Sequence, residues 1–221
     1  MNPIWRGHSR KCDVFRGDKV ASIDRLFVTP LYRAELEQVD WSEMARCCRL
    51  MEKSDKAGRS WSKSHGYRGY TSYASLNDLP TRSPEFGALK VVLDGHAAAF
   101  ATAAAFDLGR RRLKLDSLWI NVLAPGGVHT GHIHPHSVIS GSYYVAVPTG
   151  ASAIRFEDPR LGLMMAAPPR RDDAPLDQRS FVSVAPKSGT LLLWESWLRH
   201  EVPMNEAAQD RISVSFNYRW G

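Results

Sequence analysis

Four of the chain's eight histidines lie within one short stretch, Val128-His-Thr-Gly-His-Ile-His-Pro-His-Ser137. The stretch is predicted to be a β-strand, and side chains two residues apart on a strand point to the same face. His132, His134 and His136 would therefore share a face, and two imidazoles at this spacing can bind one ion of iron, zinc, copper or nickel. Pro135 is expected to end the strand, which favours His132 and His134 as ligands. The competing interpretation is a set of surface histidines.

A second polar pattern lies near the end of the chain. His200 is followed eleven residues later by Arg211, and from Arg211 to Tyr218 polar and apolar residues alternate strictly. One face of this strand is expected to pack on an apolar core, and the other to meet a polar environment. Arg211 with Ser213 can hold a carboxylate through two N–H donors and one O–H donor. An exposed edge strand would alternate in the same way, but the spacing after His200 favours a cavity.

The chain from residue 113 onward is rich in β-forming residues separated by Pro, Gly and Asp turns. Eight strands are expected, at 115–123, 128–134, 141–147, 153–156, 180–184, 190–194, 199–202 and 211–218. This number of short strands predicts a double-sheet jelly roll, a mainly β fold of cupin-like type. In the first strand, Trp119 and Asn121 either face the same cavity or belong to ordinary sandwich packing, with Asn121 bonded to backbone. Residues 157–179 form a long insertion, of a length that is uncommon unless the loop is functional or disordered.

The first half of the chain predicts two helices that flank this β core. Asp40 can cap a helix that ends at Gly58, with Glu43 completing a capping-box pattern. A second, alanine-rich helix is expected from Pro84 to Asp107, with Ser83 as its cap and His96 packing on its surface rather than binding a ligand. The expected organisation is a single domain over 1–221, in which residues 1–112 support a core formed by 113–221.

The connecting segments of this half are less regular. Residues 19–29 contain strand-like pieces, and residues 31–37 are expected to be a short helix or irregular. Residues 59–82 are predicted to be a loop crossing one face of the core. Its aromatic residues, Trp61, Tyr67, Tyr70 and Tyr73, either line a substrate pocket or anchor the loop, and anchoring is the favoured interpretation.

Composition narrows the class of protein. The chain has no apolar run long enough to cross a bilayer and no apolar leader at Met1. Its three cysteines, Cys12, Cys47 and Cys48, fit reduced thiols and therefore the cytoplasm. The net charge is +6, with arginine clusters at 110–112 and 170–171. Without an aromatic platform these clusters predict solvated surface rather than nucleic-acid binding. A homodimer is the commonest assembly for such a chain and is the one considered.

Taken together, four segments resemble the iron(II)/2-oxoglutarate-dependent oxygenases, and within them a bacterial and phage family of unassigned substrate. The segments are Trp119-Ile-Asn-Val122, 132–145, Phe156-Glu-Asp-Pro159 and Arg211-Ile-Ser-Val-Ser-Phe-Asn217. The resemblance covers about residues 113–220 and also touches 69–78.

The resemblance implies a double-stranded β-helix with iron(II) at one open end, held by His132, His134 and His200. It implies that Arg211 and Ser213 bind the distal carboxylate of 2-oxoglutarate, with Tyr144 and Asn121 as further cosubstrate-binding candidates. The implied activity is hydroxylation of a small-molecule or peptide substrate, coupled to the formation of succinate.

The chain departs from the wider superfamily at His134, where an Asp or Glu ligand is usual. Glu157 or Asp158 could supply a carboxylate instead, although no spacing requires it. Two alternatives to the oxygenase follow. The chain could be a three-histidine cupin-type dioxygenase that does not use 2-oxoglutarate, with Arg211 holding a substrate carboxylate. It could also be a non-catalytic metal-binding module.

Overall fold

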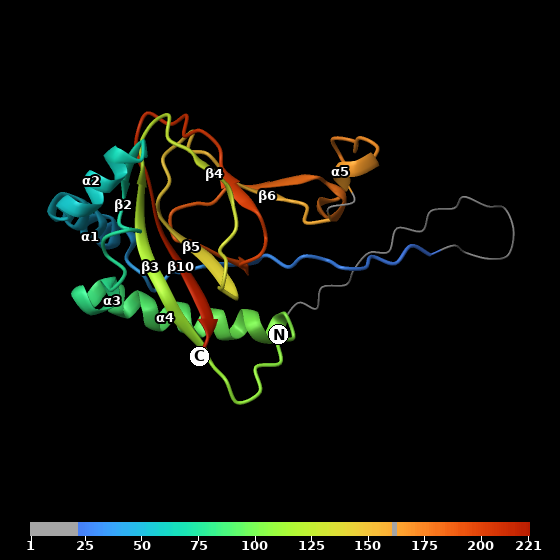
Figure 1. The fold of residues 1–221 in the computed structure, drawn as a ribbon, viewed down its shortest axis with the longest axis horizontal. Helices are drawn as coiled ribbons and strands as arrows, with labels where there is room; N and C mark the ends of the chain where they lie inside the picture. The colour runs from blue at the N-terminus through green and yellow to red at the C-terminus, as the bar shows by residue number, and fades with distance from the viewer. Residues whose placement is uncertain (1–21, 161–162) are drawn as a thin grey trace, which may run out of the picture.

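The computed structural model describes residues 22–160 and 163–221 and contains two antiparallel β-sheets, with helices covering the outer face of one sheet (Figure 1). The larger sheet has the strand order β1-β8-β5-β10-β3-β2, and the smaller sheet has the order β4-β9-β6-β7. The strands are β1 (Tyr32–Glu35), β2 (Gly69–Thr71), β3 (Leu113–Leu123), β4 (His129–His132), β5 (Ile139–Ala146), β6 (Ile154–Glu157), β7 (Phe181–Val184), β8 (Thr190–Glu195), β9 (His200–Val202) and β10 (Arg211–Trp220). All eight expected strands are present, so the predicted jelly roll is confirmed.

The strand β10 lies at the centre of the larger sheet, between β3 and β5. Its apolar residues Ile212, Val214 and Phe216 join the core that packs under the helices. Its polar residues face the space between the two sheets. Each buried Val, Ile or Phe side chain contributes about 1.5–3 kcal/mol, so this alternation holds the strand in one register.

The described helices are α1 (Trp41–Ser54), α2 (Lys56–Ser64), α3 (Leu79–Arg82), α4 (Pro84–Ala103), α5 (Leu163–Ala166) and the short 3₁₀ helix η1 (Leu176–Gln178). Asp40 caps α1 as predicted, because its carboxylate accepts hydrogen bonds from the N–H groups of Ser42 and Glu43. Ser83 lies at the cap position of α4, but its side chain makes no capping hydrogen bond. Helix α4 lies along the outer face of the larger sheet (Figure 1).

The prediction that Gly58 ends the first helix is wrong. The first helix, α1, ends at Ser54. The carboxylate of the next residue, Asp55, accepts a hydrogen bond from the Gly58 N–H at 2.9 Å and caps α2. Gly58 lies inside α2. A Cβ atom at this position would be 2.2 Å from Asp55 and 2.9 Å from the Tyr70 ring. Glycine is therefore needed for close packing and not as a stop signal.

Other local predictions are also corrected. Residues 31–37 contain strand β1, and residues 59–82 hold the end of α2, strand β2 and α3 rather than one loop. Helix α4 ends at Ala103, before Asp107, because Ala105 adopts a positive φ of 55°. Residues 22–29 form no strand, while residues 19–21, Cys12 and the expected absence of a leader lie outside the described residues. The insertion at 157–179, in its described part, contains α5 and η1 and projects from the smaller sheet (Figure 1).

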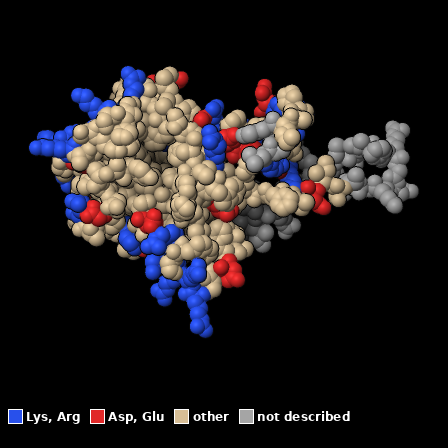
Figure 2. All heavy atoms as spheres, in the orientation of Figure 1, with Lys and Arg blue, Asp and Glu red and all other residues tan. Residues whose placement is uncertain are grey.

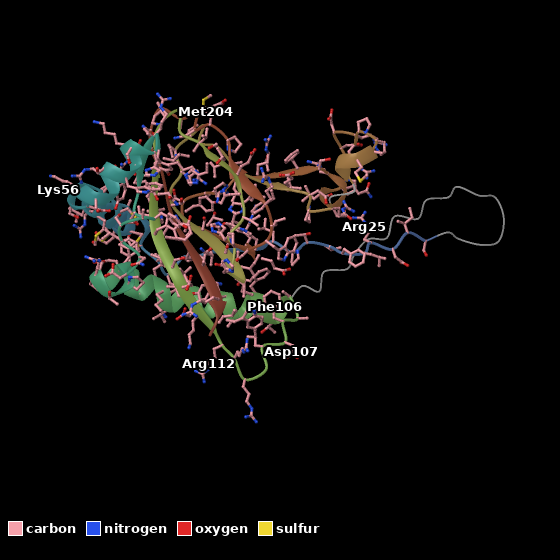
Figure 3. All side chains as sticks on the ribbon, viewed as in Figure 1. Arg25, Lys56, Phe106, Asp107, Arg112 and Met204 are labelled. Carbon is pink, nitrogen blue, oxygen red and sulfur yellow. The ribbon has the colours of Figure 1, made fainter. Side chains whose placement is uncertain are left out.

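The surface charge is unevenly distributed. Lys and Arg side chains gather along the left and lower margins of the face in Figure 2, whereas the centre of this face is largely uncharged. Arg110, Arg111 and Arg112 are exposed on the loop between α4 and β3, where Figure 3 shows Arg112 near the lower edge. Arg170 and Arg171 are exposed as well. Among the described helices, none combines the length and apolar character that a membrane crossing requires.

Candidate metal centre

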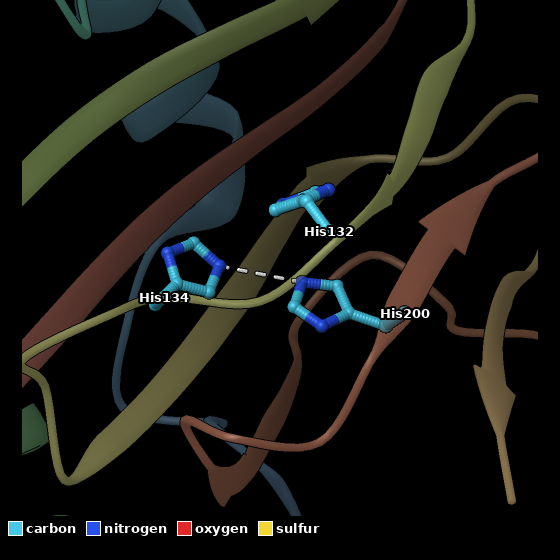
Figure 4. A group of neighbouring side chains, drawn as sticks. All are labelled: His132, His134 and His200. Atoms are coloured by element: carbon cyan, nitrogen blue, oxygen red, sulfur yellow. Dashed lines mark hydrogen bonds between the residues drawn. The ribbon is translucent and has the colours of Figure 1, made fainter. Parts of the chain in front are cut away.

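Three histidines from distant parts of the sequence meet between the two sheets (Figure 4). Strands β4 and β9 pair so that His132 lies directly opposite His200. His134 follows two residues beyond β4 and is held there by a hydrogen bond from its backbone N–H to the Ser196 carbonyl. One nitrogen atom from each of the three rings lies within 4.8 Å of the other two. The group therefore has the dimensions of a site for one metal ion.

Backbone carbonyls orient two of these rings. His132 Nδ1 is 2.6 Å from the Thr130 carbonyl, and His200 Nδ1 is 2.9 Å from the Leu198 carbonyl. A carbonyl oxygen can only accept, so Nδ1 carries the proton in both rings and Nε2 keeps its lone pair. His200 Nε2 and His134 Nε2 are 3.3 Å apart. Fixing a ligand histidine through its other nitrogen is the arrangement that metal sites use.

The environment of the histidines favours neutral imidazole, which is the metal-binding form. Burial, reinforced by the neighbouring His132, lowers the pKa of His134 to about 4. Burial and the same neighbour lower the pKa of His200 to about 3. Both lone pairs are therefore free of protons at neutral pH, as metal coordination requires.

Among the described residues, no carboxylate joins this group of three histidines. Glu157 is paired with Arg199 at 2.7 Å, and Asp158 with Arg160 at 2.5 Å. Three imidazoles are neutral ligands, so a divalent ion held by them alone would keep its full +2 charge. A site of this kind favours an anionic ligand at its open positions.

Polar donors gather around Arg211 at the base of the same cavity, which has a volume of about 560 Å³. The Arg211 side chain is 2% exposed, its guanidinium lies 4.8 Å above the Tyr144 ring, and it forms no ion pair with any described acidic residue. Arg211 Nε and the Tyr144 hydroxyl have no hydrogen-bond partner among the described residues. Register places Ser213 of β10 between Tyr144 of β5 and Asn121 of β3. These unpaired donors around one buried positive charge fit a carboxylate.

A chain of hydrogen-bonded polar groups continues from this site along the cavity wall. Asn121 accepts a hydrogen bond from the Thr71 hydroxyl and donates one to the Ser215 hydroxyl. Ser215 is in turn 2.9 Å from the Ser142 hydroxyl. Asn121 therefore faces the cavity, which was the first of its two interpretations. Its amide forms hydrogen bonds with side chains and not with the backbone. Trp119 lines the cavity as well.

The structure also shows that His129, to which the sequence assigned no role, lines the cavity. The Tyr67 hydroxyl is 2.7 Å from His129 Nε2, and both residues line the cavity. Burial, together with the nearby charge of Arg211, lowers the pKa of His129 to about 3. The position of His129 in the histidine cluster was a signal, but its alignment with Tyr67 depends on contacts between distant parts of the chain.

Some of the remaining aromatic residues and histidines line the cavity, and the others lie outside it. Trp61, Tyr67 and Tyr73 line the cavity, whereas Tyr70 is buried in the core, so both interpretations of this segment apply in part. His136 is exposed, has a positive φ of 68° and lies outside the metal group. His96 packs against the sheet with its Nδ1 2.8 Å from the Tyr32 hydroxyl.

Comparison with solved structures shows the class of fold, the double-stranded β-helix. The epimerase SnoN, in complex with Fe3+, α-ketoglutarate and nogalamycin RO, superposes with a TM-score of 0.58 at 14% identity, covering 86% of this chain and 79% of that one. A prolyl-4-hydroxylase from Pseudomonas putida gives 0.57 at 14% identity, covering 86% and 93%. HygX from Streptomyces hygroscopicus, with nickel, 2-oxoglutarate and hygromycin B bound, gives 0.54 at 16% identity, covering 86% and 83%.

A family model matches the sequence of the core. Residues 117–217 match the model of a family described as "Putative 2OG-Fe(II) oxygenase". The segment that forms the β core, including all three histidines of the metal group and Arg211, therefore matches this family, and the resemblance drawn from the sequence is confirmed. No curated protein sequence matches the chain.

Proposed function

We propose that this protein is an iron(II)- and 2-oxoglutarate-dependent dioxygenase that hydroxylates a small-molecule or peptide substrate. One observation carries the proposal: a group of three imidazoles and a buried arginine without an acidic partner among the described residues lie in the same cavity. The first can hold a metal ion and the second an anion, and 2-oxoglutarate bound to iron would occupy both. The family match over residues 117–217 supports this combination.

In the proposed site, His132, His134 and His200 hold the metal through one nitrogen each. Imidazole suits iron, and three ligands leave positions open for a cosubstrate and oxygen. Because the ligands are neutral, the carboxylate of 2-oxoglutarate at the metal would offset one of the ion's two positive charges, and the distal carboxylate would offset the charge of Arg211. The chemistry supplied by the bound metal and cosubstrate is decarboxylation of 2-oxoglutarate to succinate and carbon dioxide, with insertion of one atom of O₂ into a substrate C–H bond.

The protein's own contribution is to orient the cosubstrate and exclude water. Arg211 and Ser213 would hold the distal carboxylate, and the Tyr144 hydroxyl would donate a further hydrogen bond. Asn121 and its hydrogen-bonded neighbours would border the rest of the cosubstrate. Because Arg211 is 2% exposed, the ion pair would form in a medium of low dielectric constant, where it is strong.

The proposal is tested by anaerobic titration with iron(II), with and without 2-oxoglutarate. Chelation of the cosubstrate to the iron should produce a weak visible charge-transfer band. The band should be lost in His200→Ala and weakened in Arg211→Ala, whereas His96→Ala should match the wild type because His96 lies outside the cavity. Iron binding without a band would contradict the use of 2-oxoglutarate.

A second candidate is a three-histidine dioxygenase that does not use 2-oxoglutarate. The observation in its favour is that no carboxylate from the part of the chain that the structure describes joins the three histidines. Arg211 would then hold a carboxylate of the substrate itself. Metal-dependent oxygen uptake without succinate would identify this enzyme. Metal binding without oxygen uptake and without succinate would identify a non-catalytic module.

We also propose that the protein is located in the cytoplasm and forms a homodimer. Cys47 and Cys48 are free and buried, which supports the reducing cytoplasm. Fractionation of cells that express the protein would test the location. Light scattering would test the expected homodimer.

A further inference from the structure

The cavity changes character from its base to its mouth. At the base, Arg211 and Ser213 are each 2% exposed and offer polar donors. At the mouth, the lining residues Tyr73, Val128 and Ile133 are 59%, 47% and 46% exposed, and they offer an aromatic ring and aliphatic surface. The base therefore suits an anion, whereas the mouth suits an uncharged partner with an apolar face.

Aromatic contacts connect the mouth to the metal group. The rings of Tyr73 and Trp119 meet edge to face, with centroids 5.2 Å apart and an angle of 72°. Trp119 in turn lies 5.9 Å from the ring of His134. A ring that packs on Tyr73 and Trp119 would consequently lie beside the group of histidines.

A second aromatic pair lines the same cavity from the end of α2. Trp61 and His65 are stacked, with ring centroids 4.1 Å apart and an angle of 16°. Trp61, His65 and Tyr73 all precede residue 117, so they lie outside the segment that matches the family. These aromatic side chains are a feature of this chain's N-terminal half, which is where a substrate preference of its own would be built.

Among the described residues, no acidic side chain, lysine or arginine lines the outer part of the cavity. The described residues that line the cavity include no Asp, Glu or Lys, and their single Arg is Arg211 at the base. A charged group placed at the mouth would lose water without gaining an ionic partner, which costs free energy. An uncharged ring gains contact with π faces and pays no such cost.

We infer that the outer cavity binds a neutral substrate through the flat face of a ring, which packs against Tyr73 and Trp119 with the reacting carbon beside His134. The ring is aromatic, or it is a sugar ring presenting its C–H face, since both offer the same apolar surface. The inference deepens the proposed oxygenase function and rests on it for the reaction, but the binding of the ring depends only on side chains that the structure shows.

The test uses three molecules of nearly equal size and different charge: benzamide, benzoate and benzamidine. Their binding is measured by saturation-transfer NMR, under anaerobic conditions, on protein loaded with iron(II) and 2-oxoglutarate, so that Arg211 is already occupied. Methyl β-D-glucopyranoside is the sugar probe. Benzamide or the glucoside should bind, and benzoate and benzamidine should bind several-fold more weakly than benzamide.

Variants connect the binding to the aromatic wall. Tyr73→Ala should weaken benzamide about fivefold to tenfold, in line with the strength of aromatic pairs, and Tyr73→Phe should restore it. Trp41→Ala is the matched control, because Trp41 is 50% exposed on α1 and does not line the cavity. The charge-transfer band should be unchanged in Tyr73→Ala, which shows that the metal site is intact.

Three results would overturn the inference. These are tightest binding by benzamidine, equal binding of the charged and neutral probes, or benzamide binding that Tyr73→Ala leaves unchanged. The same NMR measurement on metal-free protein separates this inference from the oxygenase proposal. If no charge-transfer band forms but the neutral ring still binds through Tyr73, the oxygenase proposal fails and the ring site stands.

Discussion

Replacing Arg211 with methionine should make the ligand-free protein more stable while removing its affinity for 2-oxoglutarate. The Arg211 side chain is 2% exposed, its Nε has no partner, and none of the described acidic residues pairs with it. Its main neighbour is the Tyr144 ring at 4.8 Å. Replacing buried ionic groups by apolar residues of similar volume is neutral or stabilising by about 1–4 kcal/mol. We therefore expect the free energy of unfolding of Arg211→Met, measured without 2-oxoglutarate, to equal or exceed that of the wild type.

Cosubstrate binding should change in the opposite direction. A carboxylate that meets Arg211 would form a buried, charge-assisted pair, and truncating one partner of such a pair costs about 2–5 kcal/mol. That cost corresponds to a dissociation constant for 2-oxoglutarate about 30-fold to 5,000-fold higher in Arg211→Met.

The assay is urea unfolding of the zinc-loaded protein, with and without 2-oxoglutarate. A ligand at 100 times its dissociation constant stabilises the folded state by about 2.7 kcal/mol, so the wild type should gain this amount and Arg211→Met, at the same ligand concentration, should gain at most about 0.9 kcal/mol. Arg155→Met is the control, because Arg155 is 42% exposed and pairs with Glu201 away from the cavity base. A variant that loses several kcal/mol of stability yet keeps the full response to 2-oxoglutarate would show that Arg211 is a structural residue, and the reasoning would be refuted.

Three further predictions test the metal group, the core and one buried carboxylate. His200→Ala should weaken iron(II) binding at least about 100-fold in an anaerobic titration, because one of three ligands is lost; affinity within a few-fold of the wild type would exclude His200 as a ligand. Gly141→Ala should lower the free energy of unfolding by about 1–3 kcal/mol in urea, since the added methyl would be 2.5 Å from Phe216; an unchanged midpoint would contradict this close packing. Burial alone would raise the pKa of Asp55, but hydrogen bonds from Ser75, the Gly58 N–H and Tyr70 outweigh it and lower the pKa. The stability advantage of the wild type over Asp55→Asn should therefore be complete above the unfolded-state pKa of about 3.9 and shrink as pH falls through the lower folded-state pKa. Unfolding measured from pH 6 downward checks the sign, and a gap that widens on acidification would be the contrary result.

Much of the β core could be predicted from the sequence because its signals are local. The alternation along β10 sends Ile212 and Val214 to the core and Arg211 and Ser213 to the cavity, and the structure shows this division. The ends of the strands could be predicted from turn residues, because a turn depends only on residues a few positions apart in the chain. The dense histidine cluster also stood out without any knowledge of the fold.

The N-terminal half was predicted less well because its elements depend on distant partners. Strand β1 pairs with β8, and β2 pairs with β3, so these short segments become strands only when an edge of the larger sheet is present. Gly58 suggested a helix end, but its role is set by the Tyr70 ring that packs against it.

By itself, the sequence determined that this protein has a β core, a histidine cluster and an arginine with a hydroxyl two residues later. Only the tertiary structure decided that His132 lies opposite His200, that Arg211 is buried with no acidic partner among the described residues, and that Tyr73 lies at the mouth of the same cavity. The physical reason is the range of the interactions. Alternation and turn formation depend on neighbouring residues, whereas strand register and the composition of a cavity depend on contacts among residues far apart in the chain.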